Sequence, residues 1–108
     1  TATSTATGTR VDTYRATTTA MRVASDTVAN ARAAVQEQEA KIADYLGTRY
    51  DSADRRHFQR LQEMVRVLGD LRTRLASAAN REYTATRAAA EARFAMVDAL
   101  PATVRNVL

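Results

Sequence analysis

Apolar side chains recur at helical spacing along the first half of the chain. One set repeats every seven residues, and a second set lies three or four residues away from it. The first set is Tyr14, Met21, Val28, Val35 and Ile42. The second set, whose inner members are small or polar, runs through Val11, Thr18, Ser25, Arg32, Glu39 and Leu46. Five consecutive heptads predict one helix of roughly 35 residues, about 50 Å long at a rise of 1.5 Å per residue.

One break divides the chain. Gly47 follows Leu46, where a helix C-cap takes a residue that tolerates a positive φ. Asp51 is expected to cap the next helix, with Asp54 three residues later imitating a capping box. The pattern predicts a hairpin turn at about residues 47–52.

A second apolar stripe follows the turn. It begins as Phe58, Leu61, Val65, Leu68, Leu75 and Ala79, and after a slip in phase it continues as Tyr83, Ala90, Phe94 and Val97. Pro101 is expected to end this helix at or just before Leu100. We therefore expect a disordered Thr-rich tail over residues 1–9, a helical hairpin domain over 10–100 and a short C-terminal tail over 101–108.

Composition supports an all-α fold. The 108 residues include 23 alanines, one proline and three glycines, and only 6% are aromatic, whereas strands favour aromatic and β-branched residues between frequent turns. Two antiparallel helices bury only one stripe against each other, so we expect a long helical hairpin that pairs with a second chain into a four-helix bundle. The predicted partner interface is Tyr14, Met21, Val28, Val35, Ile42, Leu61, Val65, Leu68 and Leu75.

The residues that usually carry chemistry are scarce. The chain has no cysteine and a single histidine, His57, and its three glycines are isolated, so no thiolate, His-based metal site or phosphate-binding loop is predicted. The pairs Glu37–Lys41 and Asp70–Arg74 have the spacing of surface ion pairs. We therefore expect a protein that is not an enzyme and that needs no cofactor or metal. No run of ~20 apolar residues predicts a membrane segment.

The charge of the chain admits two interpretations. Its net charge of +4 comes from 15 arginines and one lysine, a usage typical of a high-GC bacterial genome. Arg55, Arg56 and Arg60 crowd the start of the second helix, with Arg49 across the turn, although cations are disfavoured at a helix N-terminus. The cluster would either contact an acidic partner or nucleic acid, or simply be solvated beside Asp51 and Asp54. The sequence favours the solvated cluster, because no stacking platform or docking motif for nucleic acid is visible.

The chain resembles the small WxG-motif proteins that type VII (ESX) secretion systems export. The turn motif of that family is matched by Tyr50, Asp51 and Ser52, and Phe58 stands eight residues after Tyr50, where the family has an aromatic or apolar residue. Tyr50 replaces the family's Trp and Ser52 its Gly. The family's C-terminal Tyr-x-x-x-Asp/Glu signal is not matched, because Tyr83 is followed four residues later by Arg87.

This resemblance implies a function in binding. It implies a homodimer or a heterodimer with a related hairpin, and secretion from the cytoplasm without a cleaved signal peptide. It also implies that a secretion ATPase grips the C-terminal tail, where Val104 and Leu108 would be the recognised residues. The heptads alone would equally serve a generic coiled-coil adaptor or a secretion chaperone, and a basic nucleic-acid-associated helical protein is the third alternative.

Overall fold

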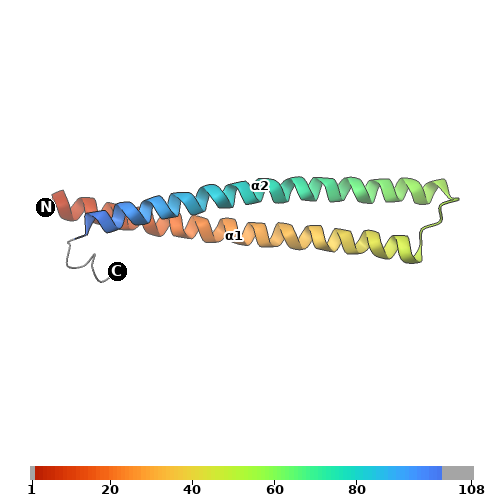
Figure 1. Cartoon of the computed structure of the whole chain (residues 1–108), viewed down its shortest axis with the longest axis horizontal. Coiled ribbons are helices and arrows are strands. Elements are labelled where there is room, and N and C mark those ends of the chain that lie inside the picture. Colours follow the sequence, from red (N-terminus) through yellow and green to blue (C-terminus); the bar gives the residue numbers. More distant parts are fainter. Residues whose placement is uncertain (1, 101–108) are drawn as a thin grey trace. The chain divides into compact units, whose positions relative to one another are not determined.

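Two long helices make up the described part of the chain. The computed structural model describes residues 2–100, with side chains from residue 7 onward. Helix α1 spans Ala2–Thr48 and helix α2 spans Arg55–Ala99, and together they form a helical hairpin without any strand in the described residues (Figure 1). This confirms the all-helical hairpin, and the end of α2 at Ala99 agrees with the stop expected from Pro101.

The hairpin divides into two compact units. The tip unit is Asp26–Ala79 and contains the turn, whereas the terminal unit combines Thr1–Ser25 with Asn80–Leu108. Each unit has a seam, by which we mean the buried and half-buried side chains where α1 and α2 face each other.

In the terminal unit, α1 begins earlier than expected. It starts at Ala2, within the segment for which the sequence predicted a disordered tail. Contacts with α2 hold this end of α1, because the Arg10 guanidinium donates to the Ala95 carbonyl at 3.2 Å and the Thr7 hydroxyl donates to the Ala99 carbonyl at 3.5 Å. Tertiary contact of this kind outweighs the weak local preference of a threonine-rich segment.

The seam of the tip unit uses a shifted set of α1 residues. The predicted Val28, Val35 and Ile42 are buried or half-buried, but Leu46 is 47% exposed. The second predicted set is displaced by one residue in this unit. Ala31, Gln38 and Tyr45 are in the seam, whereas the predicted Arg32 and Glu39 are exposed. The shift arises at the half-buried positions Thr18, Met21 and Ala24, which are separated by two successive steps of three residues instead of alternating steps of four and three.

On α2, no change of phase occurs. The buried and half-buried positions keep one heptad register through His57, Leu61, Met64, Leu68, Leu71, Leu75, Ala78, Glu82, Ala85, Ala89, Ala92, Met96 and Ala99. Tyr83 and Phe94, which the sequence placed in the stripe, are 68% and 72% exposed. The predicted slip after Ala79 is therefore wrong, because small alanines occupy the seam of the terminal unit and the larger aromatic residues lie outside it.

The turn also differs from the expected one. Gly47 lies inside α1 and no described residue has a positive φ. Helix α1 ends because the Tyr45 carbonyl accepts hydrogen bonds from the amides of both Arg49 and Tyr50, at 3.0 and 2.8 Å. The N-cap of α2 is Asp54 rather than Asp51, since the Asp54 carboxylate accepts from the Arg56 amide at 2.9 Å.

The seam predicts a contrast between two nearby positions of α2. Leu68 is 8% exposed and Val65 is 51% exposed. Leu68→Ala should lower the free energy of unfolding by about 2–3 kcal/mol, near the low end for a buried leucine because a seam with one neighbour collapses easily. Val65→Ala should change it by about 0.5 kcal/mol or less. Urea denaturation followed by circular dichroism measures both, and equal losses would show that the seam does not have this register.

Candidate functional site

Tyr45 is the centre of the hairpin tip. It is 6% exposed, and its ring stacks on the His57 ring with centroids 5.9 Å apart. Tyr50 meets the same ring edge-on at 6.1 Å, and the Arg60 guanidinium carbon lies 5.6 Å from its centroid. One aromatic side chain in the last turn of α1 thus contacts three side chains, one from the turn and two from α2. Sequence reasoning missed Tyr45, because the predicted stripe placed Leu46 in the seam instead.

The residues of the predicted turn motif have different surroundings. Tyr50 is half-buried against Tyr45, as expected of a ring that packs on the hairpin end. Asp51 and Ser52 are exposed, and the Asp51 carboxylate accepts from the Ala53 amide at 3.0 Å, which closes the bend. Phe58 is 48% exposed. The structure therefore brings Tyr50 into the tip packing and leaves Phe58 largely on the surface.

Asp54 organises the polar side of the tip. Its two carboxylate oxygens accept from Arg56 side-chain nitrogens at 3.4 and 3.2 Å. These side-chain hydrogen bonds, with the one from the Arg56 amide, hold the pKa of Asp54 below its ordinary value. His57 Nε2 lies 3.7 Å from Asp54 Oδ2, while the Asp51 amide donates to His57 Nδ1 at 3.2 Å. This arrangement assigns the proton of the neutral imidazole to Nε2.

Several side chains of the tip line a hollow. We call it the tip hollow; its lining residues are Tyr45, Arg49, Arg56, His57 and Arg60. Three guanidinium groups and an imidazole surround one aromatic ring, so the lining donates hydrogen bonds and carries positive charge. Such a lining suits an anionic group better than an apolar one.

Most of the predicted partner-interface residues lie in the seams of the chain's own hairpin. Buried or half-buried positions are Tyr14, Met21, Val28, Val35, Ile42, Leu61, Leu68 and Leu75, whereas Val65 is 51% exposed. The large apolar residues that remain exposed in the described chain are Val23, Leu46, Phe58, Val65, Tyr83 and Phe94. The predicted tail residues Val104 and Leu108 lie outside the described residues.

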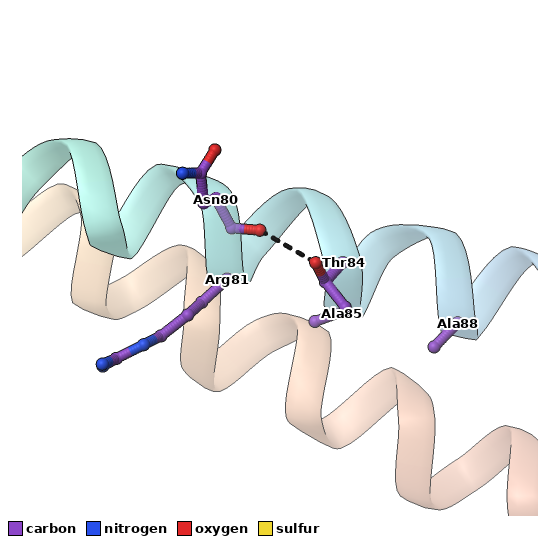
Figure 2. A pocket seen from close by; sticks show the side chains of 5 residues that line it. All are labelled: Asn80, Arg81, Thr84, Ala85 and Ala88. Atoms are coloured by element: carbon purple, nitrogen blue, oxygen red, sulfur yellow. Dashed lines mark hydrogen bonds between the residues drawn. The ribbon is translucent and has the colours of Figure 1, made fainter.

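A second hollow lies in the terminal unit (Figure 2). Its lining residues, all on α2, are Asn80, Arg81, Thr84, Ala85 and Ala88. The Thr84 hydroxyl donates to the Asn80 carbonyl of its own helix at 3.1 Å, so that hydroxyl already has a partner. The methyl groups of Ala85 and Ala88 leave room beside the helix, and the hollow contains no acid–base or nucleophilic pair.

The tip packing predicts how substitutions of Tyr50 behave. Tyr50→Ala removes the ring that meets Tyr45 and should lower the free energy of unfolding by about 1–3 kcal/mol, as expected for a large-to-small change at a half-buried site. Tyr50→Trp keeps an aromatic face and should be tolerated. Thermal melts followed by circular dichroism compare the two variants with the parent chain. An alanine variant that melts like the parent would show that Tyr50 does not contribute to the stability of the turn.

Among the described residues, no group of three or more His, Cys, Asp or Glu side chains is placed to hold a metal ion. Neither described helix contains a segment that is both long and apolar enough to cross a membrane. Compared with protein-family models, curated proteins and solved structures, the chain gives no match to any of the three.

Proposed function

We propose that this protein acts by binding, as one half of a helical bundle completed by a second hairpin. The observation that supports this most is the thin core. The buried apolar residues of the described chain are Val28, Val35, Tyr45, Leu68, Ala78, Ala89 and Ala92, and no described side chain is less than 2% exposed. Three of the seven are alanines, which bury little apolar area.

Large apolar side chains outside the seams supply a surface for the partner. Val65 and Phe58 are half-exposed in the tip unit, and Tyr83 and Phe94 are more exposed in the terminal unit. Scattered apolar residues are ordinary on a protein surface. In a hairpin with so few fully buried side chains, covering these four would remove further large apolar side chains from water. A second helical hairpin, from an identical or a related chain, offers long apolar stripes of the required kind.

The turn supports a narrower proposal, that the protein is a type VII secretion substrate or the co-secreted partner of one. Tyr50 stands at the Trp position of the WxG motif that the chain resembles, and it packs at the hairpin end. Val104 and Leu108 are proposed as the tail residues that a secretion ATPase grips. A generic coiled-coil adaptor or secretion chaperone would share the same hairpin, so export is the property that separates these functions.

Pairing is the first consequence to test. The purified chain should be dimeric by light scattering at micromolar concentration, or should become dimeric when the product of an adjacent gene encoding a related hairpin is added. Val65→Asp or Phe94→Asp should abolish pairing and leave the hairpin helical, because each puts an unpaired charge into the proposed interface but not into a seam.

Ser77→Asp is the matched control for Val65→Asp. Ser77 is exposed in the same unit and lies a third of a turn round the helix from Val65. It should leave pairing unchanged. A cooperatively folded monomer that gains no partner under either condition would refute the proposal of a bundle.

Export is the second consequence. Helix α2 ends at Ala99, before Pro101, so Val104 and Leu108 follow the bundle helix in the sequence. Changing both to alanine should leave the melting temperature and pairing unchanged while secretion, or binding to a secretion ATPase domain, falls sharply. Their spacing of four residues would place both on one face of a helical turn that docks in a groove.

The tail experiment combines a melting curve, a pull-down and a secretion assay on one set of variants. Earlier melting of the double variant would assign the two residues to the bundle instead. Normal melting with undiminished binding and export would remove Val104 and Leu108 from the recognition element.

A further inference from the structure

The tip hollow contains two arginines whose charges are not balanced locally. Arg56 is engaged by Asp54, with its Nη2 atom 3.2 Å from Asp54 Oδ2. Among the described residues, no carboxylate lies within 4 Å of the guanidinium nitrogens of Arg49 or Arg60. In the same unit Lys41 pairs with Glu37 at 3.5 Å, as predicted, and Arg66 pairs with Glu63 and Asp70. The other arginines of this unit without an ion pair among the described residues are Arg32, Arg55, Arg72 and Arg74, and none of these lines the tip hollow. The expected partner of Asp70 was Arg74, but Arg66 takes its place at 3.3 Å.

The packing at the tip positions the guanidinium of Arg60 and the backbone of Arg49. The Arg49 amide is bonded to the Tyr45 carbonyl at 3.0 Å, which fixes its backbone just after α1. The Arg60 guanidinium lies over the Tyr45 ring. A guanidinium held on an aromatic face keeps its nitrogens at the ring edge available for hydrogen bonds to an anion. Both arginines line the same hollow.

We propose that the tip hollow binds a carboxylate of a protein partner, with Arg49 and Arg60 as the residues that hold it. Each guanidinium presents paired N–H donors whose geometry matches the two oxygens of a carboxylate. Tyr45 forms the apolar wall, against which the methylene groups of a glutamate or aspartate side chain would pack. This site goes beyond the proposed function and does not depend on it, because none of its lining residues is among the exposed apolar residues through which pairing is proposed.

Charge balance favours a protein carboxylate over nucleic acid. Residues 44–60 contain four arginines and three aspartates, so the tip has a net charge of only +1. Nucleic-acid binding draws its affinity from many phosphate contacts, typically six to ten, and the remaining acidic residues of the tip would repel a polyanion. One compact acidic group matches two unpaired guanidiniums without bringing further negative charge against Asp51 and Asp54.

An NMR titration tests the site on the full chain. The isotope-labelled protein is titrated with an acetylated, amidated Gly-Glu-Gly peptide, which carries one carboxylate, and the side-chain Nε–H signals of the arginines are followed. Those of Arg49 and Arg60 should shift and saturate with a dissociation constant on the order of 1 mM, as expected for a single carboxylate at an exposed pair of guanidiniums. Those of Arg72 and Arg74, exposed in the same unit, should not saturate.

Variants make the test specific. Arg49→Gln removes one guanidinium without touching the Arg60–Tyr45 contact and should weaken the binding of the Gly-Glu-Gly peptide about tenfold. Arg72→Gln makes the same change of net charge outside the hollow and should weaken it less than about twofold. Circular dichroism of both variants verifies that the helices are retained, and Arg60→Gln provides a second variant on the other side of the hollow.

Three results would overturn the proposal. Equal weakening by Arg49→Gln and Arg72→Gln would reduce the effect to net charge. The absence of saturable shifts at either tip arginine would remove the site. A thymidine oligonucleotide that binds more tightly than the Gly-Glu-Gly peptide, loses affinity steeply with salt and depends on Arg49 would assign the hollow to nucleic acid instead.

Discussion

The contact of each helix with a single neighbour is the constraint on which the rest of the structure depends. A helix that packs against one other helix buries about two positions per heptad, and its remaining surface faces solvent or a partner. Alanines such as Ala89 and Ala92 let α1 and α2 approach closely in the terminal unit, but each contributes little apolar area. In the tip unit the seam also includes a polar side chain, Gln38, whose amide donates to the Met64 carbonyl at 3.0 Å. A hairpin built in this way has little stability to spare, which is why the exposed apolar residues are central to the proposed function.

The sequence predicted the elements well and the register less well. The seven-residue repeat of Val28, Val35 and Ile42 marks the buried face of α1 because large apolar residues occupy every position of that set. The second predicted set of α1 was misplaced by one residue from Ser25 onward. Ala24 and Ala31 lie in the seam, but such small side chains do not stand out in the apolar pattern. On α2 the same bias favoured Tyr83 and Phe94 over alanines, since side-chain size is a poor guide where close helix approach decides what is buried.

The turn shows which local signals are reliable. Tyr50 was predicted to pack at the hairpin end, and it does. The caps were less predictable. Glycine is a common C-cap residue and aspartate a common N-cap residue, yet Gly47 lies inside α1 and Asp51 does not cap α2. A carbonyl that accepts from two amides ends α1, and the carboxylate nearest the start of α2 caps it. The residue types identify the place where a helix breaks, but they do not decide which of two aspartates three residues apart caps α2, because both can accept a hydrogen bond from the amide two residues later.

The shifted register of α1 also determines the chemistry of the tip. Consecutive residues of an α-helix point about 100° apart, so a seam with Leu46 in place of Tyr45 would turn the tyrosine ring away from α2. His57 would then lose the ring on which it stacks, and Arg60 the aromatic face that positions its guanidinium. Tyr50 would lose the same contact from the turn side. Within the tip unit, the phase of the α1 seam through Val28, Val35 and Ile42 thus places the Tyr45 ring, and the ring in turn positions the Arg60 guanidinium in the tip hollow.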